Sequence, residues 1–382
     1  MQKSKHIIAD LGDWLLNRLQ RLTLNGFKSI KAIDIELHPL NILIGANGAG
    51  KSNLISFFKM LNEMMAGRFQ QFIGVSGRAQ SLLYFGPKTT LQIEAKLEFE
   101  VENGVDSYHL RLFHAAGDTL IFAEETLSFL QTGRTSPKTD ELGAGHQETR
   151  IREAAKEGKQ TAKMLEYLLN RCRVYHFHDT SSTAGVRQSC YVGDSRWLMP
   201  DAGNLAALLL RFREENGGAA YQRIIGTIRL IAPFFDDFVL EPDASNRVIL
   251  NWREKESDRV FGPHQFSDGT LRAICLATLL LQPENELPAL IVVDEPELGL
   301  HPYALNVVAD LLSKTALHTQ ILISTQSSSF LDNFEPENVI AVNREGKESQ
   351  FKRLNPTELD AWLDEYSLGE VWEKNIIGGG PH

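Results

Sequence analysis

Cysteine is scarce in this sequence, and long apolar runs are absent from it. The three cysteines, Cys172, Cys190 and Cys275, lie far apart and form no CxxC pair, which argues against a disulfide framework or a zinc ribbon. The longest apolar runs, such as residues 273–277 and 289–293, are far shorter than the ~20 residues that a membrane-spanning helix needs. We therefore expect no membrane span, and we expect the cysteines to be reduced packing residues.

A net positive charge is also absent, since the formal charge is -10 at pH 7. This balance argues against a surface built for nonspecific DNA binding, although a local basic patch stays open. Residues 1–20 carry Asp10 and Asp13 inside their only apolar stretch, so they lack the uninterrupted apolar core of a secretion signal. We expect this segment to form a short amphipathic helix, and we expect the protein to be cytoplasmic.

The apolar pattern divides the chain into three parts. Residues 1–130 contain short apolar segments typical of strands, an expected helix over residues 52–65, and an alternation from residue 88 onward that predicts an antiparallel β-lobe. Residues 131–255 should be mainly helical, and residues 256–382 alternate strands and helices as a parallel sheet requires. Within the middle part we expect a mobile polar loop at 131–147 and helices at 150–173, 204–215 and 221–231.

Residues 45–52 read GANGAGKS and match the phosphate-binding pattern GxxxxGK[ST] in full. The segment lies between an expected strand and an expected helix, which is the context that supports this motif. Glycines let the backbone amides turn toward a phosphate, and the helix N-terminus adds positive charge. We expect Lys51 to contact the phosphates of ATP and Ser52 to bind Mg²⁺. The expected ATP-binding residues are Gly45, Ala46, Asn47, Gly48, Ala49, Gly50, Lys51, Ser52 and Asn53.

A second site is expected where the apolar residues 289–293 end in Asp294 and Glu295. A buried strand of this kind delivers carboxylates to the carboxyl edge of a parallel sheet. In isolation, the two acids would be explained more simply as a polar strand end. In a chain that also has the phosphate-binding loop (P-loop) of residues 45–52, we expect Asp294 to hold Mg²⁺ together with Ser52. We expect Glu295 to act as the catalytic residue that polarises the attacking water.

Other segments carry a resemblance to a known family. Residues 266–270, FSDGT, resemble the ABC signature motif, and residues 294–302, DEPELGLHP, resemble the Walker B motif and D-loop of the SMC/RecF/OLD branch of ABC ATPases. Residues 321–327, ILISTQS, are similar to the switch strand of that branch. Residues 176–181 and 372–375 resemble a bacterial AAA-type ATPase group associated with defence or repair. The resemblance implies an α/β fold, a P-loop NTPase of ABC type with a mixed sheet, an antiparallel β-lobe and a helical insertion.

The same resemblance implies a dimer held together by ATP. Ser267 and Gly269 would contact the γ-phosphate bound by the other subunit of a head-to-tail homodimer, although Ser267 is also a suitable N-cap for an ordinary helix. Where the family often has a histidine, this chain has Gln326, which forms hydrogen bonds but carries no positive charge. We expect Gln326 to be a catalytic residue and turnover to be slow. Gln80 is the one candidate for the Q-loop glutamine.

By resemblance, the chain is an ATPase that acts as a motor or switch in bacterial DNA repair or anti-phage defence. No second catalytic constellation follows Asn375, so a Toprim-type nuclease would come from a separately encoded nuclease or effector partner. One alternative is a nucleotide-gated scaffold that sequesters a toxic effector with little turnover. The other, an ABC transporter subunit, is disfavoured because Ser267 follows Lys51 by more than half the chain length, whereas transporter subunits place the signature much closer.

Two weaker patterns concern nucleic acid and metal. Lys and Arg outnumber Glu within residues 150–173, which suits DNA contact, but a solvated helix face is the commoner explanation. His176, His178 and Asp179 could form a metal cluster, yet no fourth ligand is evident. We therefore favour the explanation that this segment belongs to the family pattern described above and binds no metal. The basic residues concerned are Arg150, Arg152, Lys156, Lys159, Lys163, Arg171 and Arg173.

Overall fold

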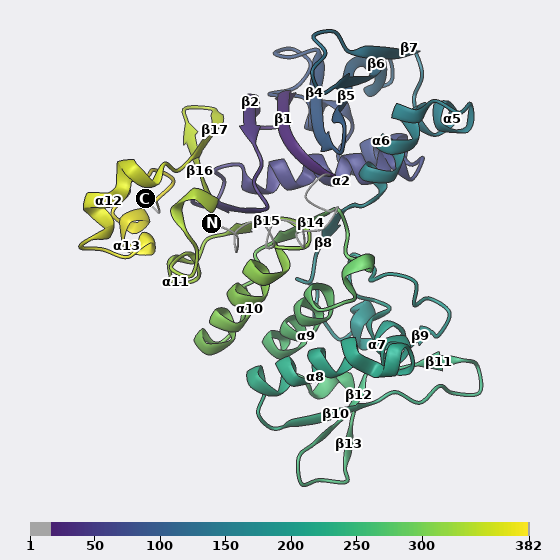
Figure 1. Cartoon of the computed structure of the whole chain (residues 1–382), viewed down its shortest axis with the longest axis vertical. Helices are drawn as coiled ribbons and strands as arrows, with labels where there is room; N and C mark the ends of the chain where they lie inside the picture. Colours follow the sequence, from purple (N-terminus) through teal and green to yellow (C-terminus); the bar gives the residue numbers. More distant parts are fainter. Residues whose placement is uncertain (1–16, 381–382) are drawn as a thin grey trace.

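The computed structural model describes residues 17–380, which form two large sheets with helices between them and on the outer face of one of them (Figure 1). The amphipathic helix expected over residues 1–20 lies outside the described residues except for its last four positions, and Arg18 begins strand β1. Within residues 17–380, no helix is both long and apolar enough to cross a membrane.

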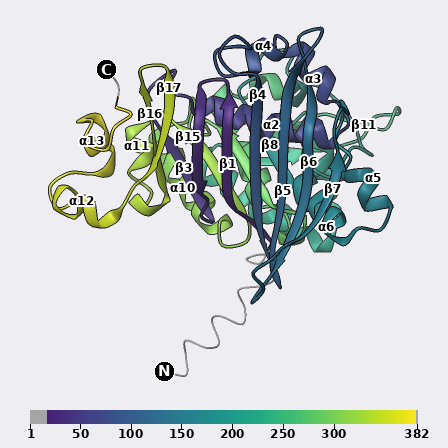
Figure 2. The same ribbon diagram turned by 90° about the horizontal axis from the view of Figure 1, so that it is seen from above.

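One six-stranded sheet is antiparallel throughout and faces the viewer in Figure 2. Its strands pair in the order β2 (Ile30–Glu36), β1 (Arg18–Phe27), β4 (Gln92–Val101), β5 (Gly104–Ala115), β6 (Thr119–Gln131) and β7 (Lys138–Gly143). Alternate side chains face the core, as in β4, where Ile93 and Leu97 are buried and Lys96 is exposed. The antiparallel β-lobe predicted from residue 88 onward is confirmed.

Strand β7 corrects the expectation that residues 131–147 form a mobile loop. Residues 138–143 pair with β6 at the edge of the sheet. Leu142 is the only fully buried residue of β7, because the strand lies at an edge and charged side chains are favoured there. A strand with one buried side chain has no apolar alternation to detect. The division of the chain at residues 130 and 255 stays a prediction, and β7 extends the first sheet past residue 130.

The second six-stranded sheet is mixed, and the P-loop lies at its carboxyl edge. Its order is β17 (Glu348–Arg353), β16 (Val339–Glu345), β3 (Leu40–Ile44), β15 (Gln320–Thr325), β14 (Leu290–Asp294) and β8 (Cys172–Tyr175). All strands except β17 run parallel. Ile42 and Ile44 pack in the core on one face and Leu43 in the core on the other, so β3 is buried on both sides, as is usual in parallel sheets. The predicted mixed sheet is confirmed.

Helices fill the space between the two sheets and cover the outer face of the mixed sheet (Figure 1). The inner group packs around α2 and comprises α2 (Lys51–Met65), α3 (Phe69–Val75), α4 (Ala79–Leu82), α5 (Ile151–Lys156) and α6 (Gln160–Asn170). The outer group comprises α7 (Leu205–Glu214), α8 (Ala219–Ile231), α9 (Asp268–Leu280), α10 (Pro302–Thr315), α11 (Ser328–Leu331), α12 (Pro356–Leu363) and α13 (Leu368–Glu373). The helices predicted at 52–65, 204–215 and 221–231 are confirmed within two residues at each end.

The structure also corrects the expectation that residues 131–255 are mainly helical. The predicted helix at 150–173 is two helices, α5 and α6, interrupted at Gly158, whose φ is +94°, and its last residues belong to β8. Short strands in this region and just after it form two small sheets, with too few residues each for a clear sequence period. They are β9 (Cys190–Tyr191), β10 (Phe235–Val239), β11 (Arg247–Val248), β12 (Asn251–Glu254) and β13 (Val260–Phe261).

Candidate functional site

The P-loop connects the carboxyl end of β3 to α2. Gly48 and Gly50 have φ of +78° and +120°, a region in which residues with a Cβ are strained. The loop closes on itself where the Ala49 N–H donates to the Ala46 oxygen at 3.2 Å. No side chain caps the N-terminus of α2, so amide groups of its first turn remain for an anion. All nine predicted ATP-binding residues from Gly45 to Asn53 therefore lie in this loop and the first turn of α2.

Lys51 is a buried cation close to three carboxylates. Its Nζ donates to the carbonyl oxygens of the first two residues of the P-loop, at 3.2 Å for Ala46. Burial lowers the pKa of Lys51, whereas Glu295, Asp294 and Glu297 act in the opposite direction. Since such charge interactions weaken with distance, the structure brings the predicted P-loop lysine and the predicted acidic site into one neighbourhood.

Asp294 and Ser52 are the two predicted Mg²⁺ ligands. Asp294 ends β14, and its carboxylate accepts a hydrogen bond from the Ser324 hydroxyl on the neighbouring strand β15. Ser52 is exposed in the first turn of α2. A carboxylate and a hydroxyl are the oxygen ligands that Mg²⁺ prefers, so the chemistry of the donors fits this ion. Their role as ligands stays a prediction.

The two predicted catalytic residues contact each other directly. Gln326, just after β15, donates from its side-chain amide to the Glu295 carboxylate. Glu295 follows β14 with φ of +42°, and its N–H donates to the Ser324 oxygen at 2.9 Å. A positive φ is uncommon for a residue with a side chain, and this turn directs the carboxylate toward the end of the neighbouring strand. The structure thus places both groups at the same sheet edge as the P-loop.

Glu297 also belongs to this site, although no separate role was predicted for it. One carboxylate oxygen accepts from the Thr325 hydroxyl at 2.5 Å and from the Gln326 N–H at 3.1 Å. The other oxygen is buried without a hydrogen-bond partner, and desolvation raises the pKa of Glu297. Its position two residues after Glu295 in DEPELGLHP was the available signal. Glu297 fixes the backbone that carries Gln326.

The predicted signature residues begin α9. The Ser267 hydroxyl caps the helix by accepting from the Thr270 N–H at 3.1 Å. Gly269 packs against the Gly299 carbonyl so closely that a Cβ atom would overlap with it. Within residues 17–380, no hydrogen bond or ion pair joins Ser267 or Gly269 to the P-loop of the same chain. The structure therefore does not bring these two predicted contacts to the other ATP-binding residues.

Two arginines that no sequence motif marks, Arg187 and Arg272, hold the start of α9 in place. The Arg187 guanidinium is buried and donates to the carbonyl oxygens of Thr180, Pro263 and Phe266 and to the Asp268 carboxylate. These bonds join the segment after β8 to the signature loop. Isolated arginines between motifs carry no pattern that would reveal this role.

Arg272 of α9 makes the second connection. It donates to the carbonyl oxygens of Phe177 and His178 at 3.2 and 2.9 Å, and to that of Leu298 at 2.9 Å. His178 and Phe177 follow β8, and Leu298 follows the Walker B acids. The segment that contains His176, His178 and Asp179 thus supplies backbone acceptors that tie α9 to the sheet edge with the predicted acids.

The outer side of the P-loop is held by the β16–β17 hairpin. The Ser349 hydroxyl donates to the Ala49 oxygen at 2.5 Å, and Arg344 donates to the Gly48 oxygen at 3.2 Å. Ser349 also bonds Ser29, between β1 and β2, at 2.7 Å. Arg344 and Ser349 lie some three hundred residues from the P-loop in sequence, so the primary sequence gives no signal for their contacts.

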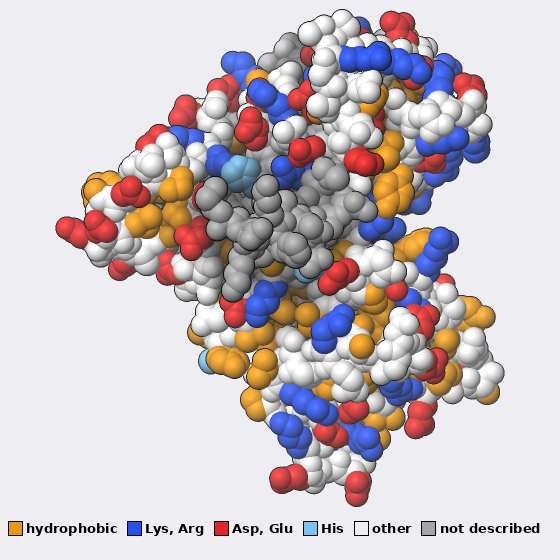
Figure 3. Space-filling model, viewed as in Figure 1, with side chains coloured by type: hydrophobic (Ala, Val, Ile, Leu, Met, Phe, Trp, Pro, Cys, Tyr) orange, Lys and Arg blue, Asp and Glu red, His pale blue; other side chains and the backbone are white. Residues whose placement is uncertain are grey.

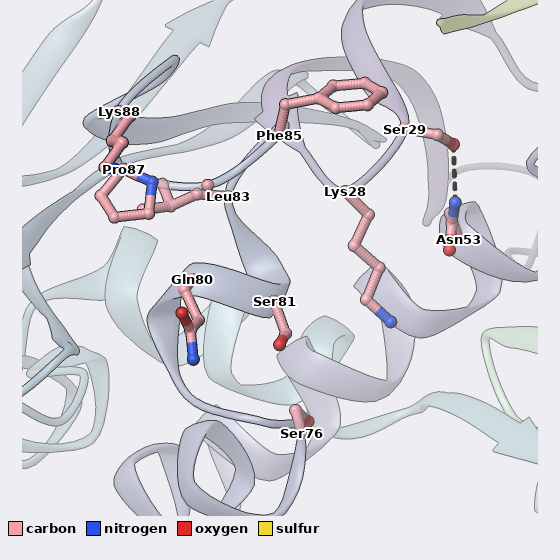
Figure 4. A pocket seen from close by; sticks show the side chains of 11 residues that line it. Lys28, Ser29, Asn53, Ser76, Gln80, Ser81, Leu83, Phe85, Pro87 and Lys88 are labelled. Atoms are coloured by element: carbon pink, nitrogen blue, oxygen red, sulfur yellow. Dashed lines mark hydrogen bonds between the residues drawn. The ribbon is translucent and has the colours of Figure 1, made fainter.

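A cavity of about 870 Å³ opens beside the first turn of α2 (Figure 4). Asn53 lines it and donates to the Ser29 hydroxyl at 2.6 Å. Lys28, Phe85 and Gln80 line it as well, and the Phe85 ring is partly exposed. Gln80, the Q-loop candidate, therefore lies in this cavity, and its N–H donates to Asp118 at 3.0 Å. The lining combines the Phe85 ring with several polar side chains.

The basic segment 150–173 is largely engaged within the chain. Arg150 donates to the Leu142 oxygen, Arg152 pairs with Glu166 at 3.5 Å, and Lys159 pairs with Asp140 at 3.8 Å. On the face seen in Figure 3, Lys and Arg side chains gather at the upper right edge, where α5 and α6 lie in Figure 1, with some acidic side chains among them. DNA contact by this segment stays a prediction.

Solved structures share this architecture. The Smc head bound to the C-terminal winged-helix domain of ScpA aligns with a TM-score of 0.60 at 16% identity, over 90% of this chain and 99% of that chain. The Smc head from Pyrococcus furiosus with an extended coiled coil, bound to the C-terminal domain of ScpA, aligns with a TM-score of 0.60 at 14% identity, over 91% and 99%. The predicted fold class, a P-loop NTPase of ABC type, is confirmed.

A family model described as "AAA domain, putative AbiEii toxin, Type IV TA system" matches residues 40–147 and 191–332, more than half of the chain. The chain belongs to this AAA domain family. The matched ranges contain the P-loop, the start of α9, the Walker B acids and Gln326. Comparison with curated proteins gives no significant match. The family model confirms the AAA-type part of the predicted resemblance, and the solved structures show that the fold is similar to that of an Smc head.

Proposed function

We propose that this AAA domain protein binds MgATP at its P-loop and hydrolyses it. The hydrogen bond between Gln326 and Glu295, at the sheet edge that also carries Lys51 and Asp294, is the observation that carries the proposal. Glu295 polarises the attacking water, and Gln326 fixes the Glu295 carboxylate and orients the water. Ser52 and Asp294 hold Mg²⁺, which neutralises phosphate charge when bound. Lys51 exchanges its bonds to the P-loop carbonyls for the phosphate oxygens.

The proposed ATP-bound form is a head-to-tail homodimer. The first turn of α9, with Ser267 as its cap, suits an anion, yet Ser267 and Gly269 are bonded to neither the P-loop nor the Walker B acids within the described residues. The triphosphate held by a second subunit would supply that anion. Gln326 is neutral where a histidine would add positive charge, which supports slow turnover.

The proposed role is that of a motor or switch subunit with a separately encoded nuclease or effector partner, in DNA repair or anti-phage defence. Support comes from the toxin–antitoxin description of the family and from the two Smc heads, each solved with a bound ScpA domain. A low turnover would equally suit a nucleotide-gated scaffold for a toxic effector. Phosphate release measured with and without duplex DNA separates a motor from a scaffold.

The substitution Glu295→Gln tests both the chemistry and the clamp. The variant keeps the shape of the side chain and loses the base, so phosphate release should fall by about 10²- to 10⁴-fold, the usual contribution of a general base. ATP should then persist and hold the dimer, which size-exclusion chromatography with Mg²⁺ and ATP detects.

Lys51→Ala is the control, because it removes the phosphate contact and should leave the chain unable to dimerise with ATP. A wild-type protein that releases no phosphate would exclude the hydrolytic site. An E295Q protein that binds ATP and still elutes as a monomer would exclude the clamp.

A further inference from the structure

The C-terminal tail, residues 375–380, passes directly over the first residue of the P-loop. A Cβ atom at Gly379 would lie 3.2 Å from the Gly45 Cα and 2.8 Å from the Val342 oxygen. Gly379 also has φ of +67°, where residues with a side chain are strained. Both the close approach and the backbone conformation therefore require glycine at this position.

The tail is held by its own hydrogen bonds. Trp372 is only 3% exposed, and its indole N–H donates to the Gly379 oxygen at 2.8 Å. The Gly380 N–H donates to the Asn375 side chain at 3.0 Å, and Ile377 is buried. These bonds fix the conformation of the tail, in which Gly379 lies against Gly45.

The helix that precedes the tail, α13, contacts the residues that follow Gln326. Helix α11 begins at Ser328, two residues after Gln326, and α13 packs against it. The Gly369 N–H of α13 donates to the Asp332 carboxylate at 2.6 Å, and Gly369 has no room for a Cβ atom beside the Ser328 backbone. A continuous set of contacts thus runs from Gln326 through α11, α13 and Trp372 to the P-loop.

A cavity of about 600 Å³ separates the two ends of this path. On one side it is lined by Asn47 and Gly48 of the P-loop, on another by Gln326, and on a third by Trp372 and the tail. The tail and the switch residue therefore border the same space at the P-loop.

We propose that the tail is a positioning element that couples Gln326 to the P-loop, with Gly379 and Trp372 as its positioning residues. This inference rests on the proposed ATP function. A terminal phosphate that contacts both Gln326 and the P-loop fixes their separation, and a tail packed against both sides favours that separation. The tail then contributes more to binding of ATP, which carries this phosphate, than to binding of ADP.

The substitution Gly379→Ala tests the coupling, with Gly346→Ala as its matched control. Both glycines have positive φ, of +67° and +60°, but a Cβ atom at Gly346 would meet nothing within 4 Å. The full chain is titrated with ATP and with ADP in the presence of Mg²⁺, and its melting temperature is recorded. For G379A we expect about a tenfold weaker affinity for ATP and a loss of about threefold or less for ADP, so the two losses should differ by at least about threefold. G346A should change neither affinity beyond about twofold.

Trp372→Phe is the second variant, because it removes the indole N–H that donates to Gly379 and keeps a ring in the buried site. It should reduce ATP affinity more than ADP affinity, by a smaller factor than G379A, and it keeps the inference testable if G379A does not fold. Equal losses of affinity for ATP and ADP would mean that the tail only stabilises the fold, and would overturn the coupling. Nucleotide affinities of G379A that equal those of G346A would overturn it as well. A wild-type chain that binds neither nucleotide would instead overturn the proposed function.

Discussion

Arg187 offers a direct measure of what holds the signature loop in place. Its side chain is 5% exposed and donates to the Thr180 oxygen at 2.8 Å, to the Pro263 and Phe266 oxygens, and to the Asp268 carboxylate at 2.8 Å. Arg187→Met keeps an unbranched apolar stem in place of the arginine stem and removes every donor. The Thr180 and Phe266 oxygens then lose the donor that Arg187 supplies, whereas the Pro263 oxygen keeps the Phe266 N–H at 3.3 Å.

The expected cost follows from those contacts. A hydrogen bond from a charged donor contributes about 1.5–3 kcal/mol, and a buried acceptor left without a partner costs about 1–3 kcal/mol. Because neighbouring bonds are not additive, we expect a total of about 3–5 kcal/mol. A chain of this size should lose roughly 1–2 °C per kcal/mol, extrapolated from smaller domains. The melting temperature of R187M should therefore fall by about 3–10 °C.

Thermal unfolding followed by circular dichroism measures this effect, with Asp268→Asn as the control. The Asp268 side chain is 63% exposed, and an exposed ion pair contributes at most about 1 kcal/mol, so D268N should shift the melting temperature by about 2 °C or less. A D268N protein as unstable as R187M would refute the reasoning, because the ion pair rather than the buried carbonyl bonds would then hold the loop.

Two further predictions concern titrating groups. Burial raises the pKa of Asp106 from 3.8 to about 6, so the folded state keeps this proton to higher pH than the unfolded chain. The stability of the fold therefore decreases as pH rises from about 4 through 6. Asp106→Asn should raise the melting temperature more at pH 8 than at pH 5, and an equal gain at both pH values would contradict the assignment. Gln326→His introduces a group that is cationic below its usual pKa of about 6.5. The rate of phosphate release should therefore rise several-fold at pH 6 and less at pH 8. A change that is the same at both pH values would count against a charge effect at this position.

Long periodic elements of the fold could be predicted, and short or polar ones could not. The strand before Gly45 and the helix after it follow from residue type, as does the alternation in β4. Strand β7 escaped prediction because an edge strand buries only Leu142. Strand β8 lay at the end of a helical pattern, and its free edge is closed by Asn62, which bonds Cys172 and Val174. That contact depends on tertiary structure alone.

The candidate site divides in the same way. Lys51, Asp294 and Glu295 belong to contiguous motifs whose spacing carries the chemistry, and the structure brings them together. Arg344 and Gly379 lie far from the P-loop in sequence. Their contacts arise only when β16 pairs with β3, so no local pattern could reveal them.

The arrangement around α9 bears on how two sites in a dimer would communicate. Gly269 packs on Gly299, and Arg272 bonds Leu298, so the start of α9 is fixed to the loop that follows the Walker B acids. In the proposed dimer, that start faces the partner's triphosphate, while Glu295 acts on the chain's own triphosphate. A movement of the Walker B loop on hydrolysis would therefore shift Ser267 at the other site. The two ATP molecules would be coupled through rigid contacts within each subunit, which predicts that opening of one site weakens the other.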